Sequence, residues 1–138
     1  MQVNPYLSFK GDCEAALDLY ARCFGAERAT IFRYGGSPMA GDVPADWSDK
    51  VMHASLKVGD QVLMAADVTP DRYEAPKGFS MSVHVDNAAD AERIFDQLAD
   101  GGRALMAIEK TFWAERFGML VDRFGVSWLI NAGGQQES

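Results

Sequence analysis

Apolar and polar residues follow a pattern along the chain that occurs twice. Two stretches carry apolar residues at spacings of three, four and seven, which places those residues on one side of a helix. These stripes consist of Ala16, Leu19, Tyr20 and Cys23 and, 75 residues later, of Ala91, Ile94, Phe95 and Leu98. Each predicted helix follows a short strand and ends near a glycine. The pattern predicts two copies of one unit, with pseudo-twofold symmetry and a possible site between the copies.

The strands around these helices are predicted from alternation and from turn residues. Gly59-Asp60, between two alternating stretches, is a strong signal for a tight hairpin. The expected strands cover residues 2–9, 29–34, 51–58 and 61–67 in the first copy, and 80–85, 105–108, 117–121 and 126–131 in the second. Both copies therefore have the order βαβββ. The predicted fold class is α+β, with tandem βαβββ modules forming curved mixed sheets around a cavity and a helix on each convex face.

A polar segment at residues 69–77 separates the two copies. We expect one domain over residues 1–138, with a first module of about 1–68 and a second of about 78–132. The loop at residues 35–49 is rich in glycine and proline, and loops of this length are often binding loops or lids.

The helix starts carry capping residues. Asp12 is expected to cap the first helix through its side chain, and Asp86 or Asn87 the second. Cys13 and Cys23 lie about 15 Å apart on the first helix, so they cannot form a disulfide with each other.

The composition argues against several classes of partner. A net charge of −7 leaves no basic patch for a phosphate backbone, so we expect no nucleic acid. No apolar run approaches the roughly 18 residues that cross a bilayer, so we expect no membrane partner. The first residues lack the charged and apolar regions of a signal peptide. Together with reduced thiols, this makes the cytoplasm the expected compartment.

Six short stretches carry a resemblance to a known family. They read NPYLSF at 4–9, KVMHA at 50–54, LMAAD at 63–67, SMSVHV at 80–85, TFWAERFG at 111–118 and DRFGVSW at 122–128. The chain resembles the vicinal oxygen chelate superfamily, which includes glyoxalases, bleomycin-resistance proteins and extradiol dioxygenases. Within it, the chain is most similar to the small bacterial PhnB-like proteins. Two positions depart from that subgroup, which usually has glycine at Ala114 and often has proline at Arg123.

The resemblance also implies where a metal would bind. The superfamily's activities depend on one divalent metal held by four side chains, and these positions correspond to Asn4, Met64, Ser80 and Leu129. A divalent cation of this kind needs several nitrogen, oxygen or thiolate donors, which Met64 and Leu129 do not offer. We therefore expect no metal and no cofactor.

Strand parity and aromatic content indicate a set of candidate ligand-binding residues. His53 and His84 are the two histidines of the chain, and either could instead be structural. Tyr6 is expected to point its phenol into the cavity, where its role could be either a ligand contact or core packing. Phe112, Trp113 and Phe117, at the rim of the second module, could form a flat apolar wall for a ligand. Core packing or a dimer contact would explain these aromatic residues equally well. The candidates are Tyr6, His53, Met64, Ser80, His84, Phe112, Trp113 and Phe117.

Three hypotheses for function follow. The first is a metal-free homodimer that binds a small, partly apolar organic molecule, as the resemblance and exposed strand edges imply. The second is a metal-dependent lyase, isomerase or dioxygenase with an atypical site around His53, His84 and Asp67. The third is an interaction module whose pocket is filled by its own side chains. PhnB-like proteins are often labelled demethylubiquinone methyltransferases, but the glycine-rich turn of a Rossmann-type methyltransferase is missing from this sequence.

Overall fold

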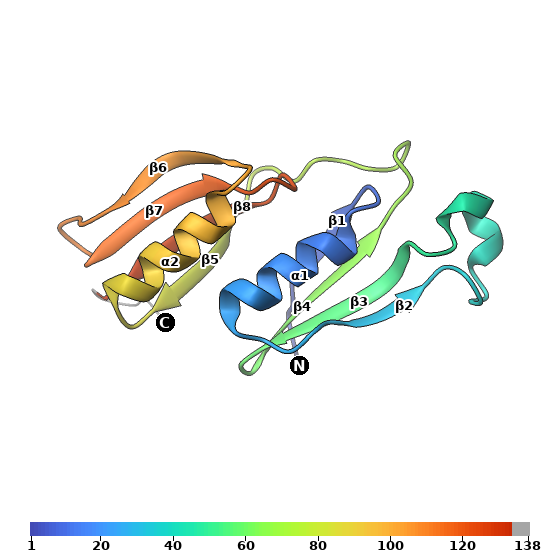
Figure 1. Cartoon of the computed structure of the whole chain (residues 1–138), viewed down its shortest axis with the longest axis horizontal. Coiled ribbons are helices and arrows are strands. Elements are labelled where there is room, and N and C mark those ends of the chain that lie inside the picture. The colour runs from blue at the N-terminus through green and yellow to red at the C-terminus, as the bar shows by residue number, and fades with distance from the viewer. Residues whose placement is uncertain (134–138) are drawn as a thin grey trace. The chain divides into compact units, whose positions relative to one another are not determined.

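The structure is a computed structural model that describes residues 1–133 of the 138-residue chain (Figure 1). It divides into two compact units, Met1–Glu74 (unit 1) and Ala75–Ser138 (unit 2). The division falls inside the polar segment 69–77. In each unit one helix packs on a four-stranded sheet, as Figure 1 shows.

Unit 1 contains four strands, one α-helix and two short 3-10 helices. In chain order these are β1 Tyr6–Phe9, α1 Cys13–Phe24, β2 Thr30–Arg33, η1 Ala40–Asp42, η2 Ala45–Trp47, β3 Val51–Val58 and β4 Gln61–Asp67. The strands lie in the order β1-β4-β3-β2. Strands β1 and β4 are parallel, and the other neighbours are antiparallel.

Unit 2 repeats this arrangement. Its elements are β5 Met81–Val85, α2 Ala88–Ala99, β6 Arg103–Glu109, β7 Arg116–Val121 and β8 Ser127–Ala132. The strands lie in the order β5-β8-β7-β6. As in unit 1, the strand that comes first in the chain, β5, is parallel to the one that comes last, β8. The predicted tandem βαβββ arrangement with mixed sheets is confirmed.

Six of the eight strands differ from the prediction at one or both ends, most of them by a single residue, and β1, β5 and β6 are described here. Strand β1 begins at Tyr6 instead of residue 2; Pro5 has no N–H for a strand ladder, although its carbonyl accepts a hydrogen bond from the Met64 N–H. Ser80 precedes β5 and lies outside it. Strand β6 is longer than expected because its pairing with β7 continues across two register irregularities.

Both apolar stripes are buried as predicted. Helix α1 also buries Leu17 and Ala21, so a wider face of it is covered. It ends at Gly25, whose positive φ of 64° is a left-handed conformation that glycine adopts readily. Among the described residues, no helix is both long and apolar enough to span a membrane.

The start of α1 differs from the prediction. The side chain of Asp12 makes no capping hydrogen bond. Instead Asp67, at the end of β4, accepts hydrogen bonds at one carboxylate oxygen from the N–H groups of Gly11 and Cys13, both at 2.9 Å. Its other oxygen accepts from the Val51 N–H, also at 2.9 Å. Asp67 is therefore a buried acceptor that ties the start of α1 to β3.

Helix α2 is capped locally. The Asn87 side chain accepts a hydrogen bond from the Asp90 N–H at 2.9 Å, so of the two predicted caps Asn87 is the one used. The buried carboxylate of unit 2 is Asp122, in the turn between β7 and β8. It accepts hydrogen bonds from two backbone N–H groups of that turn and from the indole N–H of Trp128 at 2.9 Å. Asp122 therefore holds a hairpin and a core tryptophan.

Candidate ligand-binding site

The sheet of unit 1 has one face covered by α1 and one open face. Pairing across the strands places Tyr6 beside Met64, Met64 beside Ser55, and Phe32 beside His53. All five side chains lie on the open face, because the alternate residues of these strands are buried under α1. Two of the predicted site residues, Tyr6 and His53, thus share this face with a third, Met64.

Tyr6 and His53 are in direct contact. The Tyr6 hydroxyl and the His53 Nδ1 are 2.9 Å apart, within hydrogen-bond distance, and the ring centroids are 5.6 Å apart. On the other side of His53 lies Phe32, stacked at 6.5 Å between centroids. Tyr6 is 50% exposed and Phe32 is 55% exposed. These three side chains form a platform of rings on the open face, which we call the Tyr6–His53–Phe32 platform.

The platform combines flat apolar surface with hydrogen-bonding groups. Partial burial raises the pKa of the Tyr6 phenol, with a smaller contribution from Cys13, so the hydroxyl stays protonated at neutral pH. The tautomer of His53 decides which of the two groups donates. In either case, a hydrogen-bonding atom of the His53 ring is left for a ligand. The thioether of Met64, beside Tyr6, is soft and adaptable.

Asp67 does not belong to this platform, although its strand, β4, is next to the strand of His53, β3. It faces α1, whereas His53 is on the open face, and both of its oxygens already accept backbone hydrogen bonds. With 1% exposure, it is out of reach of a cation on the open face. Asp67 is therefore unavailable as a ligand to the predicted atypical metal site around His53, His84 and Asp67.

The four positions implied by the superfamily's metal site do not fit a metal either. In unit 1 the Asn4 amide nitrogen donates to the Gln2 side chain at 3.3 Å, and Met64 offers only a thioether sulfur. In unit 2, Ser80 is exposed and Leu129 has no donor atom. Within residues 1–133, three or more His, Cys, Asp or Glu side chains nowhere gather as a metal centre would require. The donor chemistry thus does not suit the superfamily's cation.

Two of the predicted site residues of unit 2, His84 and Phe117, are the strand neighbours of Asn131 on either side of it. His84, on the open face of that sheet, is within hydrogen-bonding contact of the Asn131 side chain. The rings of Phe112 and Trp113 are 4.8 Å apart, and those of Trp113 and Phe117 are 5.4 Å apart. Phe112 is 97% exposed, so this cluster is not a closed core. An apolar wall at this place stays a prediction.

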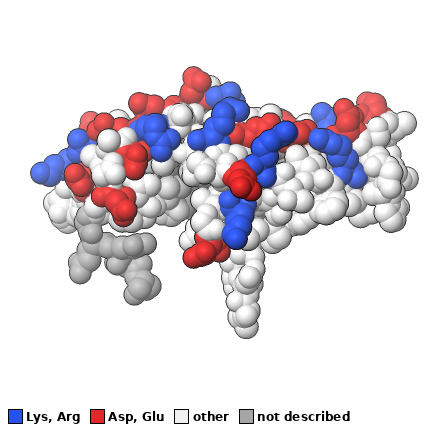
Figure 2. Space-filling model, turned by 60° about the horizontal axis from the view of Figure 1, so that its bottom comes forward, with Lys and Arg blue, Asp and Glu red and all other residues white. Residues whose placement is uncertain are grey.

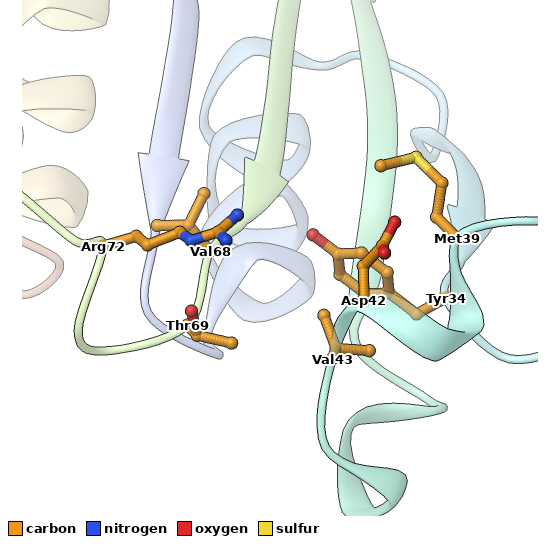
Figure 3. Close-up of a pocket in the computed structure, with 7 residues that line it drawn as sticks. All are labelled: Tyr34, Met39, Asp42, Val43, Val68, Thr69 and Arg72. Atoms are coloured by element: carbon orange, nitrogen blue, oxygen red, sulfur yellow. The ribbon is translucent and has the colours of Figure 1, made fainter.

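Sequence reasoning missed Phe32 and a pocket at the end of the unit 1 sheet where β2 and β4 end. The pocket has a volume of about 260 Å³ and is lined by Tyr34, by η1 and its neighbours, and by residues that follow β4 (Figure 3). The glycine- and proline-rich loop at 35–49 was the available signal, because η1 lies in it. Phe32 carried no signal beyond a single aromatic residue in a short strand.

Charge on the surface is mixed. On the face shown in Figure 2, Lys and Arg side chains lie among Asp and Glu and form no continuous basic area. Several ion pairs join opposite charges among residues 1–133, such as Arg33 with Glu14 at 3.0 Å and Arg116 with Glu92 at 2.8 Å. The open-face residues of unit 1 named above include no Asp, Glu, Lys or Arg.

Comparisons with solved structures show which proteins share this fold. The fosfomycin resistance protein FosX from Mesorhizobium loti shares the fold, with a TM-score of 0.61 and 12% identity over 96% of this chain and 91% of that one. A PhnB protein from Bacillus cereus has a TM-score of 0.80 at 23% identity, covering 96% of this chain and 100% of that one. The fold is therefore that of the vicinal oxygen chelate proteins.

The family is also defined. Residues 1–131 match the model of the 3-demethylubiquinone-9 3-methyltransferase family, and the chain belongs to this PhnB-like family. Protein YjdN of Escherichia coli (strain K12) is 33% identical over 99% of this chain and 98% of its own length. Protein PA1353 of Pseudomonas aeruginosa, known from a crystal structure, is 45% identical with a TM-score of 0.86, over 98% of this chain and 99% of that one.

Proposed function

We propose that this protein binds a small, partly aromatic organic molecule on the Tyr6–His53–Phe32 platform, without a metal. The observation that carries the proposal is the contact between the Tyr6 hydroxyl and His53 Nδ1 on an exposed sheet face, with Phe32 stacked against the same imidazole. A ligand ring would stack on this surface, and a polar group on it would hydrogen-bond to His53.

Exposure of the platform supports a ligand. Large exposed apolar surfaces on a regular sheet mark binding sites more often than scattered apolar residues do. Ligand sites in general combine aromatic walls with a few placed polar groups, and the platform has this composition. Met64 lies beside Tyr6 and can adjust its shape to different ligands.

The methyltransferase in the family's description does not guide the proposal. Methyltransferases of the Rossmann type need a mainly parallel sheet with helices on both faces. Each unit here has a four-stranded mixed sheet with one parallel pair. The donors at the metal positions likewise give no support to a metal-dependent lyase, isomerase or dioxygenase. Binding is therefore favoured over these enzyme activities.

A homodimer completes the proposal. The edge strand β2 is short and mostly exposed, and β6 is an exposed edge strand in unit 2. Unpaired edges of this kind favour association with another strand. Light scattering coupled to size-exclusion chromatography tests it, with twice the 15.1 kDa chain mass expected and a monomer contradicting it.

The binding site is tested with matched variants. Wild type, His53→Ala, Tyr6→Phe and Ser82→Ala would each be screened by ligand-observed NMR against a set of monocyclic and bicyclic aromatic fragments. Ser82 is the control, because it takes the place of Tyr6 in unit 2. We expect hits whose affinity falls about fivefold or more in His53→Ala and less in Tyr6→Phe, and that Ser82→Ala leaves unchanged.

Two outcomes would overturn the proposal. One is a set of hits whose affinity is the same in wild type, His53→Ala and Tyr6→Phe. The other is native mass spectrometry that shows a stoichiometric adduct after nickel, zinc, manganese or iron is offered, since a bound metal would favour the enzyme.

A further inference from the structure

A second place in unit 1 has the composition of a ligand site. The pocket of Figure 3 lies between the η1 segment on one side and the segment after β4 on the other. Its apolar wall is formed by Met39, Val43 and Val68 and by the ring of Tyr34. Its volume of about 260 Å³ is below the range of drug-sized sites, so it suits a small molecule.

Two opposite charges flank this pocket. Arg72 follows β4, and Asp42 ends η1. In the view of Figure 3, the guanidinium of Arg72 and the carboxylate of Asp42 lie on either side of the Tyr34 hydroxyl. Within the described part of the chain, neither side chain forms an ion pair. The two charges are thus available to a ligand that carries both signs.

The floor of the pocket is tied to the sheet by hydrogen bonds. Tyr34 is buried, and its hydroxyl donates to the backbone carbonyl of Asp67 at 2.7 Å. The loop that carries η1 is held to the sheet by hydrogen bonds from the Tyr34 N–H to the Lys50 carbonyl at 3.1 Å and from the Gly35 N–H to the Ser48 carbonyl at 2.7 Å. The ring of Tyr34 and the start of the loop that carries Asp42 are therefore fixed by hydrogen bonds.

We propose that this pocket binds a small zwitterion with an apolar side chain, of the α-amino acid type. The ligand carboxylate contacts Arg72, whose guanidinium is suited to two parallel hydrogen bonds with a carboxylate. The ammonium contacts Asp42, and the apolar side chain lies against Met39, Val43 and Val68. This site is separate from the Tyr6–His53–Phe32 platform and does not depend on it.

Three matched compounds test the proposal. L-leucine carries both charges, 4-methylpentanoate lacks its ammonium, and 3-methylbutylamine lacks its carboxylate. Binding would be followed by NMR of protein labelled with ¹³C at the methionine methyl groups, where Met39 reports on the pocket and Met64 on the platform. We expect L-leucine to shift the Met39 signal, and each single-charge analogue to bind roughly threefold or more weakly, as befits exposed ion pairs.

Variants assign each charge. Arg72→Gln should remove the preference for L-leucine over 3-methylbutylamine, and Asp42→Asn should remove the preference over 4-methylpentanoate. Both residues are exposed, so the fold is kept, and the unchanged Met64 signal checks this. The proposal is overturned if no compound shifts Met39, if all three bind equally, or if both variants keep the wild-type preferences. A shift of Met64 without Met39 would likewise contradict it while leaving the platform intact.

Discussion

The two units share a framework but differ in what they place on it. Their sheets have the same strand order, and both helices bury apolar stripes of the same spacing. At the end of the parallel strand pair, however, unit 1 has Asp67 and unit 2 has Ala132. On the open face, Tyr6 in unit 1 stands where unit 2 has Ser82. The comparison teaches that a repeated fold can keep its core pattern while its helix anchors and its open faces diverge.

The helix anchors should show the largest difference. Asp67→Ala removes the acceptor of three backbone N–H groups, two of them at the start of α1, and leaves these buried donors unsatisfied. We expect the free energy of unfolding to fall by about 3 kcal/mol or more. Asn87→Ala, which removes the local cap of α2, should cost about 1 kcal/mol. Urea unfolding measures both.

If Asp67→Ala and Asn87→Ala lowered the free energy of unfolding equally, the roles assigned to these two helix anchors would be contradicted. If Asp67→Ala fails to fold, Asp67→Asn gives the same comparison, because it keeps the shape and loses one acceptor oxygen.

The next largest difference in the free energy of unfolding should come from packing under the helices. Gly118 in β7 occupies the place of Ala54 in β3, since each pairs with the residue two positions before the end of the last strand of its unit. A methyl group at Gly118 would lie 2.8 Å from the ring of Phe95 and 2.9 Å from the Cα of Ile108. Gly118→Ala should therefore lower the free energy of unfolding by about 1–3 kcal/mol. An unchanged midpoint in thermal or urea unfolding would show that α2 has room to move.

Alkaline pH should affect unit 1 before unit 2, because all four tyrosines lie in residues 1–74. Burial, and next the nearby Asp67, raise the pKa of Tyr34, and burial raises that of Tyr6. A phenol whose pKa is higher in the folded chain stabilises the fold below its unfolded value of about 10, and this contribution is lost as pH rises further.

Methionine methyl NMR can follow this loss separately in each unit. Above about pH 10, signals of Met39 and Met64 should change before those of Met81 and Met119, and Tyr34→Phe should weaken the dependence. If the methionine signals of both units changed at the same pH, and Tyr34→Phe had no effect, the tyrosines of unit 1 would not be the cause.

The two cysteines of unit 1 should show the smallest effect, which is measured as the rate of thiol labelling. Cys13 and Cys23 are free and buried in α1. Burial, followed by the charge of Asp67, raises the pKa of the Cys13 thiol. In native protein at pH 8, neither thiol should react with a disulfide reagent such as dithionitrobenzoate, whereas the Asp67→Asn variant should react faster. Rapid labelling of native wild type would show that α1 opens readily.

Much of the fold could be predicted from sequence because its signals are local. The two apolar stripes, Gly25 and the Gly59-Asp60 turn each specify structure within a few residues. Asp67 could not be assigned in this way. Its partners Gly11, Cys13 and Val51 are backbone groups 56, 54 and 16 residues away, so no local pattern predicts that it anchors a helix.

The candidate site was predictable only in part. The sequence predicts that Tyr6 and His53 each lie toward the cavity, but it does not predict their contact. That contact depends on the register of β1, β4 and β3. Phe32 joins them because β2 pairs with β3 next to a register irregularity, which leaves no local signal in the sequence. Arg72 and Asp42 meet around a pocket through tertiary structure alone.

The central claim is that a ligand docks on the Tyr6–His53–Phe32 platform, and one measurement tests it directly. An aromatic fragment found by ligand-observed NMR would be titrated into wild type and His53→Ala, both carrying ¹³C methionine methyl groups. We predict that the Met64 signal shifts saturably in wild type, that the shift is lost or strongly weakened in His53→Ala, and that Met119 on the open face of unit 2 does not respond. A shift of Met119 with Met64 unmoved, or an equal response of Met64 in both proteins, would contradict the account.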